Sequence, residues 1–140
     1  TLRLATDFKN IIAIKEASGD IVQIMEVLKN KPVDFIVLSG DDALTLPMIY
    51  MGAQGVISVI GQSHPKEFSN MVSLALSGNK LLANEIHYKL YDFYKPFYSE
   101  GNPVGVKMCL ELLGICKSVV RLPLVEASIT IKNEFRKLLN

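Results

Sequence analysis

The residue best suited to covalent chemistry is Lys15, which ends the apolar run 11–15 (IIAIK) and is followed at once by a turn. An uninterrupted run of Ile and Ala predicts a strand buried on both faces of a parallel sheet. In α/β proteins, ligands bind and reactions occur at the carboxyl ends of such strands. Alternation along the strand places Ile11, Ala13 and Lys15 on one face. Lys15 therefore occupies a position at which a lysine can react.

Two interpretations of Lys15 are open at this point. A lysine stem held among Ile and Ala is poorly solvated, and desolvation favours the neutral amine that forms a Schiff base with a ketone or aldehyde. The more common interpretation of a lysine at a strand end is a stem lying on apolar surface with the ammonium in water. Other residues must decide between the two.

Glycines and carboxylates follow the later strands. Gly40 comes directly after one apolar strand and Gly55 begins another, and a glycine there allows a ligand to approach the backbone closely. Turn geometry alone is the more common explanation of such glycines. Asp41 and Asp42 form a carboxylate pair, but no further oxygen or histidine ligand recurs at a suitable spacing. We therefore interpret the pair as helix-capping residues and predict no metal site.

The histidines and cysteines make no case for a metal site or a catalytic triad. His64 and His87 stand alone, one in a loop before a proline and the other in a predicted helix. Cys109 and Cys116 lie in apolar helical surroundings, which predicts buried thiols rather than a disulfide or a metal pair. This cysteine use favours a reducing compartment, so we expect a cytoplasmic protein. The tyrosines of residues 88–98 recur at helical spacing, which predicts packing.

The elements that must position Lys15 repeat as strand and helix three times. The predicted strands are residues 11–15, 35–39 and 56–60. Each is apolar throughout and is followed by a short connection and a helix, which predicts a parallel α/β fold with right-handed crossovers. Pro47 lies too deep in the predicted helix 43–51, so we expect a kink there or a later helix start.

From residue 80 the pattern becomes helical. Helices are predicted up to about residue 98, over residues 104–113, and after Ser128, which suits an N-cap. No linker composition divides the chain. We therefore expect residues 1–79, with the strands, and residues 80–140, with only helices, to belong to one structural unit.

The composition excludes some functions. The chain has 140 residues with 49% hydrophobic residues, a mean hydropathy of +0.27 and a formal net charge of +1. This charge gives no electrostatic basis for binding nucleic acid or an acidic membrane surface. No apolar run approaches the roughly 20 residues of a membrane-spanning helix. We expect neither nucleic acid nor a membrane as a partner.

Five ordered segments make the chain similar to a known superfamily. They are residues 12–19 (IAIKEASG), residues 38–42 (LSGDD), residues 52–59 (GAQGVISV), Asn102-Pro103 with Lys107, and residues 121–124 (RLPL). Together they resemble the dihydrodipicolinate synthase and N-acetylneuraminate lyase superfamily. The second and third segments are closer to the dihydrodipicolinate synthase branch than to the sialic acid lyase branch.

The resemblance implies a fold and a chemistry. The fold would be the C-terminal part of a (β/α)8 TIM barrel, namely strands six to eight with their helices, followed by a C-terminal helical segment. Lys15 would form an imine with pyruvate, and the resulting enamine would attack aspartate semialdehyde in lysine biosynthesis. Gly40 and Ile57 match backbone contacts around the bound pyruvate. The covalent imine implies that no cofactor is needed, and the family implies a homo-oligomer, commonly a tetramer.

The chain departs from the family pattern in what it lacks. The Gly-Thr-Thr segment that holds the pyruvate carboxylate, the tyrosine segment that relays protons and the arginine for the second substrate are not found in it. Three parallel strands alone would also leave both outer edges unpaired. We therefore expect a fragment, inactive alone, that is completed by the N-terminal half of the barrel from the same protein or another chain. Another pyruvate-dependent aldolase, for sialic acid or a keto-sugar acid, and an inactive structural half-barrel stay open as alternatives.

Overall fold

The computed structural model describes residues 1–140, which form two compact units. The sheet unit contains residues 1–58 and 70–84, and the helical unit contains residues 59–69 and 85–140. Of the three boundaries between them, two fall inside helices α4 and α5, and the third falls between residues 58 and 59, before η1. The predicted division into residues 1–79 and 80–140, as parts of one structural unit, stays a prediction.

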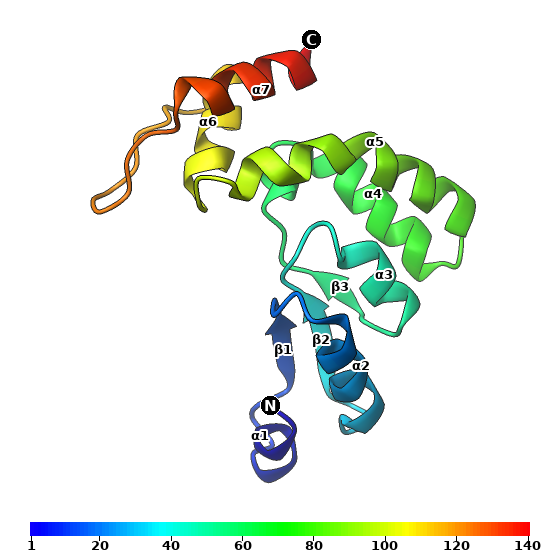
Figure 1. The fold of residues 1–140 in the computed structure, drawn as a ribbon. Coiled ribbons are helices and arrows are strands. Elements are labelled where there is room, and N and C mark those ends of the chain that lie inside the picture. Colours follow the sequence, from blue (N-terminus) through cyan, green and yellow to red (C-terminus); the bar gives the residue numbers. More distant parts are fainter. The chain divides into compact units, whose positions relative to one another are not determined.

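Three strands alternate with helices in the first half of the chain, and helices follow (Figure 1). The elements in order are α1 (Leu2–Asp7), β1 (Ala13–Glu16), α2 (Ile21–Asn30), β2 (Ile36–Ser39), α3 (Thr45–Tyr50), β3 (Gly55–Val56), the 3-10 helix η1 (Ile60–Gln62), α4 (Pro65–Leu76), α5 (Lys80–Tyr98), α6 (Val104–Leu112) and α7 (Ile129–Leu139).

The three strands form one parallel sheet in the order β1-β2-β3. In its register Lys15 lies opposite Leu38, and Leu38 lies opposite Gly55. The predicted parallel α/β arrangement is confirmed, but β3 is shorter than predicted and ends at Val56. One more bond follows it, from the Ile57 amide to the Ser39 carbonyl at 2.8 Å. Because β2 itself ends at Ser39, no partner continues the ladder, and the chain turns into η1.

One face of the sheet packs against α2 and α3. Its core contains the buried residues Ile24, Val27, Phe35, Val37, Met48 and Ala53, with Ile14 of β1 packed against them. The prediction that the first strand is buried on both faces is wrong for this chain. Ile12 is 63% exposed, and the Lys15 side chain is exposed as well. Within residues 1–140 only the face of β1 that carries Ile14 is covered.

Residues close to the helix N-termini explain where α2 and α3 begin. Asp20 caps α2, and its carboxylate accepts hydrogen bonds from the amides of Val22 at 2.9 Å and Gln23 at 3.1 Å. The expected late start before Pro47 is confirmed, because α3 begins at Thr45. Pro47 then lies in the first turn, where a backbone N–H has no intrahelical partner and its absence costs little.

The helical unit packs around aromatic rings. Phe97 of α5 and Phe135 of α7 are fully buried, with ring centroids 5.1 Å apart. The predicted N-cap Ser128 accepts a hydrogen bond from the Ile131 amide at 3.4 Å, and α7 begins at the next residue. Both cysteines are free, and Cys109 is buried as predicted. Cys116 is exposed, contrary to the prediction, because it lies after α6 has ended.

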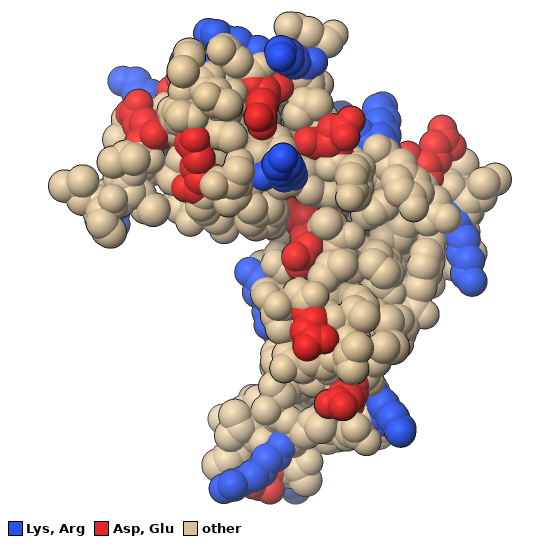
Figure 2. All heavy atoms as spheres, in the orientation of Figure 1, with Lys and Arg blue, Asp and Glu red and all other residues tan.

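The surface carries both signs of charge. On the face shown in Figure 2, acidic and basic side chains are interspersed, with no extended area of one sign. No helix combines the length and apolar character that crossing a membrane requires. No group of three or more His, Cys, Asp or Glu side chains is arranged to hold a metal ion.

Candidate functional site

Lys15 is the third residue of β1 and lies near the carboxyl end of the strand. Its backbone is held by the ladder to β2, while its side chain extends from the uncovered face of the sheet and is exposed. From the sequence, Ile11 and Ala13 are expected to desolvate the stem of Lys15. In this chain they do not, because Ile11 instead packs on the core side against the cluster beneath the sheet. Lys15 thus lies near the carboxyl end of the sheet and its side chain remains accessible to water.

Gly40 directly follows β2 and is brought against Lys15. Its amide donates a hydrogen bond to the carbonyl of Glu16 at 2.7 Å, which extends the pairing of the two strands by one step. A Cβ added to Gly40 would lie 2.9 Å from Cε and 3.0 Å from Cγ of Lys15. The absence of a side chain at residue 40 therefore makes room for the lysine stem.

Ile57 follows β3 at the same edge of the sheet. Its amide donates to the Ser39 carbonyl at 2.8 Å, and its side chain is 49% exposed. Because all three strands are parallel and adjacent, Lys15, Gly40 and Ile57 come from the carboxyl ends of neighbouring strands. The amides of Gly40 and Ile57 are already used within the sheet, so contacts to a ligand must use their other atoms.

Two buried polar residues that the sequence pattern does not indicate as site residues shape this edge. The Glu16 carboxylate is buried and accepts a hydrogen bond from the Ser18 amide at 2.7 Å, which fixes the turn after Lys15. The Ser39 hydroxyl is fully buried, donates to the Asp41 carbonyl at 2.7 Å and accepts from the Asp41 amide at 3.1 Å. The signal available in the sequence was a polar residue at the end of each apolar strand.

The prediction that the aspartate pair caps the next helix is wrong, because the N-cap of α3 is Leu44 and no side chain caps the helix. The Asp41 carboxylate accepts a hydrogen bond from the Leu44 amide at 3.0 Å, although Leu44 itself occupies the N-cap position of α3. Asp42 is fully buried. No histidine or further carboxylate joins the two aspartates in a metal-binding group.

The histidines lie in the helical unit and have structural surroundings. His64 contacts the Phe93 ring at a centroid distance of 4.5 Å, and its Nδ1 lies 2.9 Å from the Ser63 hydroxyl. Burial lowers the pKa of His64, and the charge of Glu67 opposes this shift. His87 is buried, and its Nδ1 lies 3.3 Å from the Tyr94 hydroxyl.

Burial also lowers the pKa of His87. The predicted packing role of the nearby tyrosines fits Tyr94, which is buried, better than Tyr88 and Tyr91, which are 69% and 56% exposed.

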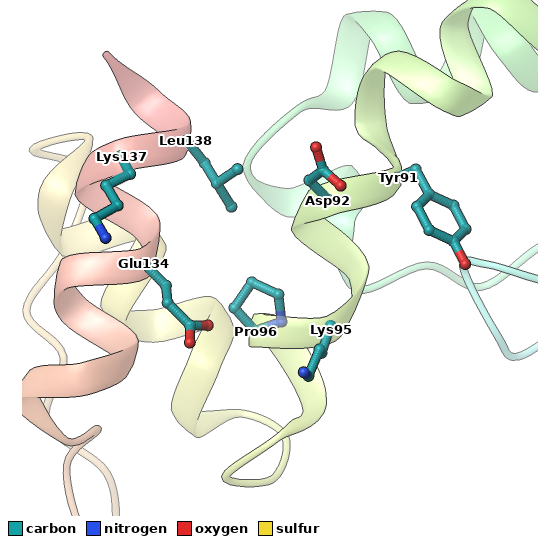
Figure 3. Close-up of a pocket in the computed structure, with 7 residues that line it drawn as sticks. All are labelled: Tyr91, Asp92, Lys95, Pro96, Glu134, Lys137 and Leu138. Carbon is teal, nitrogen blue, oxygen red and sulfur yellow. The ribbon is translucent and has the colours of Figure 1, made fainter.

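A hollow of about 370 Å³ lies between α5 and α7 in the helical unit (Figure 3). Pro96 and Leu138 face into it, and charged side chains of both signs surround it. None of the predicted site residues lines it. The C-terminal landmarks also belong to the helical unit: Asn102-Pro103 precedes α6, Lys107 lies within it, and residues 121–124 lie in the loop before α7.

Solved structures resemble the chain closely. A crystal structure of dihydrodipicolinate synthase from Aquifex aeolicus matches 99% of this chain at 43% identity and a TM-score of 0.94, using 47% of its own chain. Dihydrodipicolinate synthase from Thermotoga maritima matches 99% at 38% identity and a TM-score of 0.95, using 48% of its chain. The chain thus has the fold of the C-terminal part of a (β/α)8 TIM barrel, three βα units followed by a C-terminal helical segment.

Curated relatives agree with the structures. The 4-hydroxy-tetrahydrodipicolinate synthase of Phocaeicola vulgatus is 52% identical over 140 residues, which is 100% of this chain and 47% of that protein. The protein of the same name from Flavobacterium psychrophilum is 53% identical over 132 residues, 94% of this chain and 45% of that protein. The chain spans about half the length of the relatives it matches. The family described as "Dihydrodipicolinate synthetase family" matches residues 1–140, so the chain belongs to this family.

Proposed function

We propose that this chain is the part of a pyruvate-dependent lyase that carries the imine-forming lysine, Lys15. The reaction would condense pyruvate with aspartate semialdehyde in lysine biosynthesis, the activity expected for relatives named 4-hydroxy-tetrahydrodipicolinate synthase. The observation that carries the proposal is the position of Lys15 at the carboxyl end of β1, with its side chain accessible and its stem against Gly40.

The chemistry assigned to Lys15 is nucleophilic catalysis. Its neutral amine would attack the ketone carbon of pyruvate, and loss of water would leave an imine. Removal of a proton from the adjacent methyl group would give an enamine, whose carbon attacks the aldehyde of the second substrate. Hydrolysis of the imine would return the free lysine. Because the imine itself accepts the electrons of the broken C–H bond, we propose that the reaction needs neither a cofactor nor a metal ion.

Gly40 and Ile57 are proposed to line the pyruvate site. Both lie at the edge of the sheet that carries Lys15, directly after the two neighbouring strands. Their amides donate to Glu16 and Ser39 within the sheet. The pyruvate contacts assigned to them would therefore come from carbonyl oxygens and from the surface that the glycine leaves open.

The active enzyme is proposed to need the rest of the barrel. The attacking amine must be neutral, and burial away from water favours that form. In residues 1–140 the Lys15 side chain is exposed, Ile12 is 63% exposed, and the outer edges of β1 and β3 have no strand partner. The N-terminal half of a barrel, from the same protein or another chain, would cover these groups. We propose that the chain alone is inactive.

The assembly and the compartment are part of the same proposal. We propose a cytoplasmic homo-oligomer, a tetramer by analogy with the family. One similar structure, matching 99% of this chain at a TM-score of 0.95, is described as a monomeric variant of dihydrodipicolinate synthase. The exposure of Lys15 favours one competing function, an inactive half-barrel with a structural role. A pyruvate-dependent aldolase for a different aldehyde shares the Lys15 chemistry and differs only in the second substrate.

The test is to trap the imine. In a chimeric barrel, residues 1–140 replace the matching 47% of the Phocaeicola vulgatus relative. Borohydride is added with pyruvate, and peptide mass analysis locates the adduct. We expect the adduct on Lys15 in the chimera and none on the 140-residue chain alone.

The unaltered Phocaeicola vulgatus protein is the positive control, and the exposed Lys9 is the internal control for nonspecific reduction. A folded chimera without an adduct, next to a trapped control, contradicts the proposal. A screen of aldehydes then separates aspartate semialdehyde from sugar-derived substrates.

A further inference from the structure

The backbone conformation at residue 40 does not require a glycine. Six glycines of the chain have positive φ values, and Gly40 is not among them. Any L-residue could adopt its backbone, since only positive φ values favour glycine strongly. The reason for a glycine at this position must therefore be space.

Three side-chain atoms occupy the space where a Cβ of residue 40 would lie. They are Cβ of Ala17 at 2.7 Å, Cε of Lys15 at 2.9 Å and Cγ of Lys15 at 3.0 Å. The register explains the contact with the lysine. Lys15 lies opposite Leu38, and residue 40 follows two positions later, directly after β2 and on the same side, so the two are diagonal neighbours. The lysine stem leans along the strand and crosses Gly40.

We propose that Gly40 is a positioning residue for the Lys15 amine. The stem of Lys15 lies against the backbone of Gly40, and the methyl group of Ala17 lies beside the same position. A side chain at residue 40 would push the stem away from its path and misplace the nucleophile. This inference rests on the proposed function, because it concerns the same lysine.

The neighbouring hydrogen bonds indicate whether Ala17 or the Lys15 stem would move if residue 40 carried a Cβ. The Glu16 carbonyl is bonded to the Gly40 amide at 2.7 Å, and the buried Glu16 carboxylate holds the Ser18 amide at 2.7 Å. Ala17 lies between these two anchored residues, and its Cβ cannot rotate away. The outer part of the Lys15 stem is exposed and has free torsions. A methyl group at residue 40 should therefore displace the flexible lysine stem, and the contact with Ala17 should lower the stability of the fold.

The experiment compares four forms of the chimeric barrel: unaltered, Ala17→Gly, Gly40→Ala, and the double variant. The double variant removes the tightest contact, that with Ala17, and leaves only the contact with Lys15. We expect Gly40→Ala to slow imine trapping at saturating pyruvate by about 10²-fold, the loss expected from a displacement of about 1 Å. The loss should fall on kcat more than on KM.

The double variant separates positioning from stability. We expect its melting temperature to return to that of Ala17→Gly while trapping stays slow. If both the melting temperature and the trapping rate recover, the contact with Ala17 is the cause and the inference is wrong. Normal trapping in Gly40→Ala also overturns it. An unaltered chimera that is not trapped refutes the proposed function itself, and with it a catalytic role for Gly40.

A second measurement needs no pyruvate and uses the 140-residue chain. Its lysines are reductively methylated with 13C, and the Lys15 resonance is assigned with Lys15→Arg. We expect this resonance to move in Gly40→Ala and in the double variant, but not in Ala17→Gly. An unchanged resonance in Gly40→Ala would show that the lysine stem does not lie on residue 40.

Discussion

Gly105→Ala should destabilise the helical unit, although alanine is the better helix former. Gly105 is the second residue of α6, and an added Cβ would lie 2.5 Å from the Phe97 carbonyl oxygen and 2.6 Å from that of Pro96. Ordinary contacts of a Cβ begin at 3.4 Å, so the new atom is nearly an ångström too close. Both obstacles are backbone atoms of α5, which cannot rotate aside. The start of α6 must move, and the buried Val104 and Val106 lose packing.

The expected loss follows from two opposing terms. Overpacking a core costs about 1–3 kcal/mol, and an obstacle of backbone atoms favours the upper end of that range. Replacing a helical glycine by alanine returns about 1 kcal/mol. We therefore expect the free energy of unfolding to fall by about 2 kcal/mol in urea titrations followed by circular dichroism.

Gly78 provides the matched control. Its added Cβ meets nothing within 4 Å, but its φ is +83°. Gly78→Ala should cost about 1–2 kcal/mol for the left-handed conformation, and Gly78→Asn should recover part of the loss. At Gly105 asparagine should be worse than alanine, because only space matters there. A Gly105→Ala protein as stable as the unaltered chain would refute the close approach of α6 to α5.

Three further predictions concern other parts of the chain. Lys15→Arg keeps the charge but removes the nucleophilic amine, since a guanidinium stays protonated, so the chimeric barrel should fold normally and lose nearly all turnover; turnover close to the unaltered level would exclude Lys15 as the nucleophile. Asp20→Ala removes the carboxylate that accepts hydrogen bonds from two amides of α2, and it should lower the free energy of unfolding by about 1 kcal/mol in urea titrations. An unchanged free energy of unfolding would contradict this capping role. Hydrogen bonds from the Ser118 hydroxyl and amide lower the pKa of Glu111 to about 2. Because this folded-state pKa lies below the unfolded value of about 4.3, the stabilisation is present above pH 4.3 and is lost as the pH falls toward 2. Melting temperatures measured from pH 5 to pH 2 should fall less in Glu111→Gln than in the unaltered chain, and parallel curves would contradict this assignment.

Local sequence signals were sufficient for most elements of the fold. Ser128 caps the helix that follows it, as expected. Asp20 also caps its helix, and Pro65 is the first residue of α4, both features of short-range sequence. The late start of α3 could be foreseen from Pro47. These features depend on hydrogen bonds and torsions within a few residues, so the neighbouring residues determine them.

Features that depend on distant partners could not be foreseen. The length of β3 is limited by the end of β2 at Ser39, because a strand needs a neighbour to accept its hydrogen bonds. The exposure of Lys15 depends on whether another part of a barrel covers its face of the sheet. The exposure of Cys116 depends on where α6 ends. An apolar pattern predicts that a face is suited to burial, but other elements must supply the cover.

For the candidate site, the sequence by itself determined that Lys15 ends one apolar strand of a parallel α/β fold and that Gly40 follows the next, so both lie at one edge of its sheet. Ile57 was expected inside the predicted strand 56–60, and the structure places it after β3 at the same edge. Only the tertiary structure decided that the stem of Lys15 lies across Gly40. That contact depends on the register of β1 against β2, and a shift of one residue would turn residue 40 to the other face. The register is set by the packing of strands that are separated by a helix in the chain, which no local pattern encodes.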